Sequence, residues 1–245
     1  MTSFSQETEE PTTLISHLVE LRNRLIIILI ATALVFIVLI PFSNEIYTFV
    51  AQPLMQLLPG DSSMIATEVA TPFLAPFKLT FFVAFVLALP VILYQIWAFL
   101  APGLYDNEKR LIMPLIIFSV LLFYAGIAFC YFVVFPLIFD FFVSMAPEGV
   151  TVMTDISSYL NFILKLFIAF GIVFEIPIAI ILLIRSGSIT PESLESKRPY
   201  IIVSCFVIGM LLTPPDIISQ ILLAIPMWLL YELGLLIGKN LLKNK

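Results

Sequence analysis

A single carboxylate interrupts a long apolar stretch of the chain. Glu175 lies within FIAFGIVFEIPIAIILLI, which runs from Phe167 to Ile184 and is otherwise apolar or small. A carboxyl group at such a place can carry a proton, pair with a cation or accept hydrogen bonds, but an ionised one facing lipid is costly. Glu175 is therefore either a neutral group hydrogen-bonded inside a helical bundle or a group that faces a wet hollow.

Two further acids stand beside basic residues at the edges of apolar segments. In TTLISHLVELRNRL, Glu20 and Arg24 have the i,i+4 spacing of a helical ion pair. Glu108, in LYDNEKR, precedes an apolar segment, where acid complements the dipole of a helix N-terminus. These structural roles explain each acid alone.

The sequence offers little to metal or nucleophilic chemistry. It has one histidine, His17, and neither a Gly-rich phosphate loop nor a His-Glu-x-x-His motif. Its two cysteines, Cys130 and Cys205, fall in different apolar segments, so we expect buried small residues rather than a disulfide. We expect no enzymatic activity, no metal, no cofactor and no nucleic-acid partner.

The composition is that of a polytopic membrane protein. Of 245 residues 61% are hydrophobic and 12% are charged, whereas soluble domains are about half apolar and a quarter charged. We predict an all-α fold with six transmembrane helices in a cupped bundle. The spans are expected near Leu25 to Phe42, Phe77 to Leu100, Leu111 to Phe135, Tyr159 to Ile184, Tyr200 to Thr213 and Ile217 to Ile237.

Basic residues orient these spans, because lysine and arginine are retained on the cytoplasmic side. The spans divide the 12 basic residues unequally, and all except Lys78 and Lys165 fall on one side. We therefore expect both termini to be cytoplasmic, with an amphipathic N-terminal region (1–24), a membrane domain (25–238) and a short tail (239–245). The first residues, MTSFSQETEE, carry acid where a cleavable signal peptide needs positive charge, so the first span should be an uncleaved anchor.

Prolines and turn residues predict bends and a structured outer face. Prolines within or beside spans free backbone carbonyls and bend helices; they are Pro90, Pro114, Pro136, Pro177 and Pro226. The outer stretch IYTFVAQPLMQLL, which contains Pro53, suggests a short helix packed on the membrane face. The fifth span is only about 21 Å long at ~1.5 Å per residue, too short for a ~30 Å hydrocarbon core. Asp216, after TPP, has the position of an N-cap for the last helix.

Several long motifs together resemble the TatC family, the multispan receptor of the twin-arginine translocation system. They are HLVELRNRL, PFLAPFKLTF, LPVILYQIWAFLAPGLYDNEKR, YFVVFPL, AFGIVFEIP and LLTPPDIISQILLAIP, in family order from about Thr12 to Gly238. The resemblance implies a receptor that binds Arg-Arg signal peptides of cargo proteins together with a TatB-like single-span partner. It also implies recruitment of TatA-like subunits, self-association in a larger complex, and export of folded proteins driven by the proton-motive force across the bacterial inner membrane.

The resemblance also implies roles for individual residues. Signal-peptide binding falls to Glu20, Glu108, Arg22 and Phe99. Glu175 corresponds to an intramembrane glutamate that faces the hollow of the cup, and a partner helix would dock at Met210, Thr213 and Gln220. Pro53, Pro90 and Asp216 are further structural or functional candidates.

Two other functions remain open from the residues alone. A proton-coupled small-molecule transporter could use Glu175 as a midplane proton site, although no clear internal repeat of spans is visible. An intramembrane enzyme would need a second catalytic group near Glu175, and the spans offer only scattered hydroxyls and two cysteines.

Overall fold

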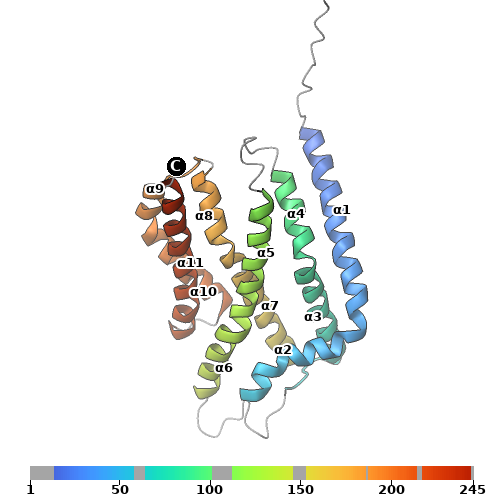
Figure 1. Ribbon diagram of the computed structural model, residues 1–245. Coiled ribbons are helices and arrows are strands. Elements are labelled where there is room, and N and C mark those ends of the chain that lie inside the picture. The colour runs from blue at the N-terminus through green and yellow to red at the C-terminus, as the bar shows by residue number, and fades with distance from the viewer. Residues whose placement is uncertain are drawn as a thin grey trace, which may run out of the picture.

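The computed structural model describes residues 14–57, 64–100, 112–145, 153–185, 187–213 and 217–243. These residues form an all-helical bundle, and the one β-type contact recorded among them is a bridge between Ile65 and Asp155 (Figure 1). The helices are α1 (Leu14–Leu39), α2 (Ser43–Leu57), α3 (Thr71–Leu87), α4 (Leu89–Leu100), α5 (Ile112–Phe129), α6 (Phe135–Ser144), α7 (Ile156–Phe174), α8 (Ile176–Arg185), α9 (Pro191–Ser196), α10 (Arg198–Leu212) and α11 (Ile217–Lys243).

Several helical stretches have the length and apolarity of membrane spans. Within the described part of the chain, four qualify alone: Ser16–Gln56, Met113–Ser144, Ile156–Arg185 and Ile217–Asn240. The pair α3 and α4 qualifies together, bent by 52°, and α10 is a shorter apolar helix. Each predicted apolar segment thus coincides with helix, and the chain is a multi-span membrane protein; the count of six spans stays a prediction.

The bundle has two distinct ends. In Figure 1 the start of α1, the end of α4, the end of α8, α9 and the end of α11 lie at the top, which we call the upper end. The helix α2, the start of α3 and the end of α6 lie at the lower end. The short helix predicted from IYTFVAQPLMQLL is confirmed as α2.

Proline chemistry explains the breaks between consecutive helices. A proline in a helix lacks an N–H and its ring displaces the carbonyl four residues earlier. The 52° bend between α3 and α4 directly precedes Pro90, and the break between α7 and α8 directly precedes Pro177. A π-helical turn, Cys130–Val134, comes immediately before Pro136 at the start of α6. The predicted bend is confirmed at Pro90. Before Pro136 and Pro177 the helix is irregular within the continuous stretches Met113–Ser144 and Ile156–Arg185, and α11 continues as helix through Pro226.

Aromatic packing between α3, the start of α6 and α7 lies in the largest core. Phe167 stacks on Phe82 with ring centroids 5.7 Å apart and lies 5.0 Å from Phe135. Helices α5 and α7 approach closely because Gly126 has no side chain. A Cβ there would lie 2.6 Å from the carbonyl oxygen of Phe170. Both cysteines are buried and free, as predicted.

The lower end has an ordered cap. The backbone of Ile65 pairs with Thr154 and Ile156, at 3.0 and 2.9 Å. Asp155 caps the N-terminus of α7 by accepting a bond from the Ser158 amide at 2.9 Å, and it accepts further bonds from the amide and hydroxyl of Thr67, at 3.2 and 2.9 Å. These bonds hold the segment before α3 against the segment before α7.

Candidate functional site

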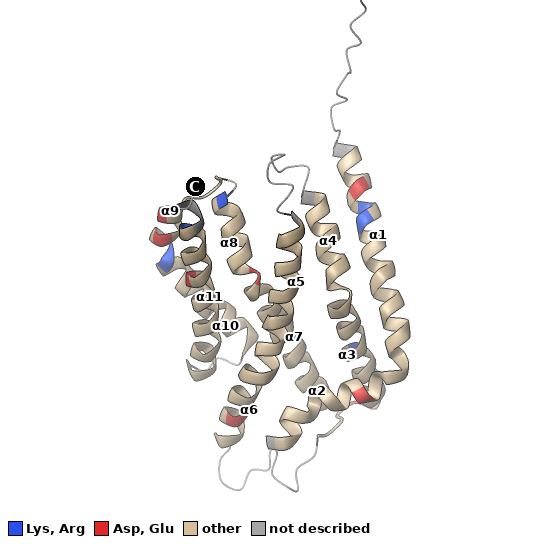
Figure 2. Cartoon of the chain, viewed as in Figure 1, with Lys and Arg blue, Asp and Glu red and all other residues tan. Residues whose placement is uncertain are grey.

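Charged side chains gather at the upper end of the bundle, while few occur along the helices below it (Figure 2). Within the described residues, most of the basic residues belong to the first part of α1, the end of α8, the junction of α9 and α10, or the last part of α11. The described basic residues outside these parts are Lys78, in α3, and Lys165, in α7. This distribution agrees with the asymmetry predicted from the sequence.

The ion pair expected from the spacing of Glu20 and Arg24 is present in α1. The Nη2 and Nε atoms of Arg24 donate to Glu20 at 2.6 and 3.0 Å. Both bonds end on the same oxygen, Oε1, so Arg24 does not use the carboxylate in its bidentate form. The Glu20 side chain keeps 34% of its surface exposed. It is therefore accessible from outside the bundle.

Arg24 also ties α1 to α4. Its Nη1 donates to Oε1 of Gln95 at 3.0 Å, and its Nη2 donates to the carbonyl oxygen of Ala98 at 3.1 Å. The last carbonyls of a helix lack intrahelical partners, and a cation satisfies both the hydrogen bond and the helix dipole there. Gln95 was missed by the sequence analysis, although it is a buried amide in the apolar run LPVILYQIWAFL. Such an isolated polar residue is the signal that could have identified it.

The other residues assigned to signal-peptide binding lie around this pair or outside the described part. Arg22 is exposed on α1 and donates to Asn23 at 3.2 Å. Phe99 is half-buried at the end of α4, next to Ala98. Glu108 lies outside the described residues, in the segment that joins α4 to α5.

A second charge network fixes α9, α10 and α11 at the upper end. The Nε and Nη2 atoms of Arg198 bond the two carboxylate oxygens of Glu232 at 2.7 and 2.8 Å. Lys239 donates to Glu195, and this hydrogen bond lowers the pKa of the Glu195 carboxyl. Glu232, which interrupts the apolar run of the last helix, is thus explained by a bidentate pair to the start of α10.

Glu175 lies at the junction of α7 and α8, two residues before Pro177. Its Oε2 accepts a hydrogen bond from the buried Ser119 hydroxyl of α5. Its Oε1 is also buried, and among the described residues it has no hydrogen-bond partner. The described residues therefore satisfy one of the two carboxyl oxygens. The other lacks a hydrogen bond, which costs free energy for a buried polar atom.

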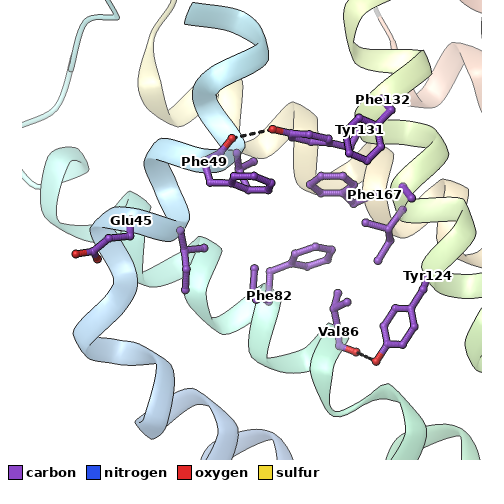
Figure 3. Close-up of a pocket in the computed structure, with 13 residues that line it drawn as sticks. Glu45, Phe49, Phe82, Val86, Tyr124, Tyr131, Phe132 and Phe167 are labelled. Atoms are coloured by element: carbon purple, nitrogen blue, oxygen red, sulfur yellow. Dashed lines mark hydrogen bonds between the residues drawn. The ribbon is translucent and has the colours of Figure 1, made fainter.

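Two tyrosines satisfy backbone carbonyls that prolines release (Figure 3). Pro53 cannot bond the carbonyl of Phe49, which instead accepts a bond from the Tyr131 hydroxyl at 2.9 Å. Likewise, Pro90 leaves the carbonyl of Val86 free, and the Tyr124 hydroxyl donates to it at 3.1 Å.

These tyrosines line an apolar cavity of about 530 Å³ between α2, α3, α5 and the π-turn. The carbonyls that Pro53 and Pro90 leave without a helical partner are thus bonded by tyrosines of neighbouring helical segments.

The residues assigned to partner docking lie on α10 and α11, at the edge of the bundle opposite α1 (Figure 1). Met210 is 49% exposed, whereas Thr213 is buried and donates to the Gly209 carbonyl at 3.0 Å. A Cβ on Gly209 would lie 3.4 Å from the carbonyl oxygen of Gln220, so the two helices meet there. The end of α10, which Met210 and Thr213 adjoin, thus packs against the part of α11 that carries Gln220, while Asp216 lies outside the described residues.

The arrangement is suited to recognition rather than to bond making. The upper end presents a partly exposed carboxylate held beside a cation, and the interior holds one carboxyl group bonded to a serine. No cluster of three or more potential metal-binding side chains occurs among the described residues.

Comparison with known proteins finds one family that matches most of the chain. The model of the family described as "Sec-independent protein translocase protein (TatC)" matches residues 16–226. The chain is 60% identical to the Haemophilus influenzae TatC over 94% of this chain and 90% of the relative. It is 56% identical to the Escherichia coli K12 TatC over 96% of this chain and 91% of the relative.

Solved structures agree. A crystal structure described as the twin-arginine translocase receptor TatC is 41% identical and superposes with a TM-score of 0.80. The match covers 91% of this chain and 98% of that one.

Proposed function

Because the chain belongs to the TatC family of Sec-independent protein translocase proteins, we propose that it is the subunit that reads the arginine pair of export signal peptides. Membership makes it a component of the twin-arginine translocase. The observation that supports the receptor role is the partly exposed Glu20 carboxylate, held on one oxygen by an arginine that is itself anchored to α4.

Arginine selectivity follows from the geometry of that carboxylate. Arg24 donates two bonds to Oε1, so Oε2 remains for an incoming guanidinium, which can donate two N–H bonds to it. A lysine ammonium is a point donor and gains less at the same site. Glu108, in the segment after α4, is the proposed second acid, and Phe99 and Arg22 are proposed to border the bound peptide.

The charge distribution supports an orientation in the membrane. Basic residues concentrate at the upper end, where α1 begins and α11 ends (Figure 2), and such ends face the cytoplasm. We infer six spans in the bacterial inner membrane with both termini cytoplasmic. The bent pair α3–α4 serves as the second span and the short helix α10 as the fifth.

The edge formed by α10 and α11 is the proposed docking site for TatB-like and TatA-like single-span partners. Helix α10 spans about 22 Å at ~1.5 Å per residue, less than the ~30 Å hydrocarbon core, so lipid must thin beside it. Met210 is exposed there and Gln220 is half-buried, which offers a partner helix both apolar and polar contacts.

Glu175 is proposed to act inside the working complex rather than in the isolated chain. Among the described residues its Oε1 has no hydrogen-bond partner, which favours water, a proton or a donor from a partner protein as the missing group. Each of the three is compatible with export powered by the proton-motive force.

Export of a folded reporter tests the proposal. The chain is expressed in cells that lack their own TatC, together with a reporter that carries a twin-arginine signal. We expect export with the unchanged chain and its loss when both Glu20 and Glu108 are replaced by Gln. Export by that double variant at the unchanged rate would contradict the receptor role.

A further inference from the structure

A polar cavity at the lower end has none of the roles described above. It has a volume of about 440 Å³, within the ~300–1,000 Å³ range of ligand pockets. Helices α3 and α7 and the segment before α3 enclose it. Its lining combines charged, hydroxyl and apolar side chains: Glu68, Thr71, Leu74, Ala75, Phe77, Lys78, Ser157 and Leu160.

The two charges of this cavity lie at different depths. Glu68 precedes α3. Lys78 lies about 10 Å along that helix from its first residue, Thr71, at ~1.5 Å per residue. Lys78 is exposed and donates to Asn161 of α7. The cavity therefore has a carboxylate near its outer rim and an ammonium group deeper in the membrane, with the hydroxyls of Thr71 and Ser157 beside them.

The rim is held in place by the cap around Asp155. This carboxylate accepts hydrogen bonds from both Thr67 and Ser158, which immediately adjoin Glu68 and Ser157. The negative charge of Asp155 is thus already engaged by donors, and the carboxylate of Glu68 is exposed. The two walls of the cavity are joined before any ligand arrives.

We propose that this cavity binds the headgroup of an aminophospholipid, with its phosphate on Lys78 and its ammonium on Glu68. In such a lipid the phosphate is attached to glycerol, close to the acyl chains, and the ammonium ends the headgroup. This order of charges matches the order of Lys78 and Glu68. Lysine binds phosphate as a point charge, and a primary ammonium donates charge-assisted hydrogen bonds to a carboxylate.

The same two charges predict that other phospholipids bind this cavity more weakly. Phosphatidylglycerol has the phosphate but no cation for Glu68, which would repel its negative charge. Phosphatidylcholine has a cation without an N–H, so it cannot donate to the carboxylate. The apolar residues Leu74, Phe77 and Leu160 offer contacts for the glycerol end and the first carbons of the acyl chains.

Native mass spectrometry of the purified full chain tests this site. Phosphatidylethanolamine, phosphatidylglycerol and phosphatidylcholine with identical acyl chains are titrated separately, and their affinities are compared. We expect the ethanolamine lipid to bind about fivefold more tightly than the other two, the effect of one partly exposed ion pair. Soluble phosphoethanolamine is included as the headgroup without chains.

Two variants and one control assign the effect to the cavity. Glu68→Gln should remove the preference for the ethanolamine lipid, and Lys78→Gln should weaken all three lipids. Lys197→Gln removes a positive charge at the opposite end and should change nothing. An unchanged preference in Glu68→Gln, or unchanged affinities in Lys78→Gln, would overturn the proposal. Displacement of the lipid by an equal concentration of soluble phosphoethanolamine would overturn the assignment to a membrane lipid.

Discussion

The hydroxyl of Tyr131 donates a 2.9 Å hydrogen bond to the carbonyl oxygen of Phe49, the acceptor that Pro53 leaves without its helical partner. Tyr124 does the same for Val86 and Pro90. Inside a bilayer no water competes for such a carbonyl, so a neighbouring helix must supply the donor. The Val86 carbonyl beside the bend between α3 and α4 receives its donor from α5, and the Phe49 carbonyl of α2 receives its donor from the π-turn.

Removing one of these donors should destabilise the bundle. We expect Tyr131→Phe to lower the free energy of unfolding by about 1–3 kcal/mol, because the Phe49 carbonyl is then left without a partner. Urea unfolding in detergent micelles measures it. Tyr94→Phe, at a half-exposed position on α4, is the matched control and should have little effect. Equal stabilities for the two variants would contradict the role of Tyr131.

Arg24 should be irreplaceable by lysine. A lysine keeps the charge but cannot contact Glu20, Gln95 and Ala98 together, so α1 should loosen from α4. We expect a loss of about 1–3 kcal/mol in unfolding free energy for Arg24→Lys. Arg22→Lys changes an exposed arginine two positions away that bonds Asn23 on the same helix, and it should be neutral. If both variants are equally stable, Arg24 does not join the two helices.

Glu175 should matter more for transport than for folding. In Glu175→Ala the Ser119 hydroxyl can donate to a carbonyl of its own helix instead, so we expect a loss of only about 1 kcal/mol. Transport should nevertheless fall. Glu175→Gln, which keeps an acceptor for Ser119 but cannot ionise, separates the causes: reduced transport identifies the ionisable group. Transport at the unchanged rate by Glu175→Ala would show that the carboxyl group is not needed.

The cap at the lower end should respond to acid. Hydrogen bonds from the Ser158 amide, and further ones from Thr67, lower the pKa of Asp155 from 3.8 to about 2. A depressed folded-state pKa means that the stabilisation is fully present above the unfolded pKa of 3.8 and is lost as the pH falls toward 2.

Comparison with Asp155→Asn isolates this carboxylate from the others that titrate in acid. The difference in unfolding free energy between the unchanged chain and the variant should be constant above about pH 5 and should shrink below it. A difference that does not change with pH would mean that the charge of Asp155 contributes nothing to the cap.

The sequence predicted features that depend on local chemistry. The breaks before Pro90 and Pro177 follow from a missing N–H, and the Glu20–Arg24 pair follows from helical spacing. That α10 is too short to cross the hydrocarbon core follows from the number of residues in its apolar segment. In each case the cause lies within one helix, so no knowledge of the packing was needed.

Features that depend on the rotation of one helix against another were not predictable. Ser119 meets Glu175 only because α5 presents that face to the junction of α7 and α8. Arg24 reaches Gln95 across 71 positions of sequence. Apolar side chains cover every face of these spans, so the pattern does not tell which face meets a neighbour. The placement of Glu108 and Asp216 falls outside the described residues.

The central claim is that the upper end reads guanidinium geometry, and peptide binding tests it most directly. A fluorescent twin-arginine signal peptide is titrated onto the purified chain in nanodiscs, beside the same peptide with two lysines in place of the arginines. We predict about tenfold weaker binding of the lysine peptide, and a similar loss for the arginine peptide with Glu20→Gln or Glu108→Gln. Glu45→Gln, at an acid near the lower end, should bind normally. Equal binding of both peptides to the unchanged chain would contradict the claim.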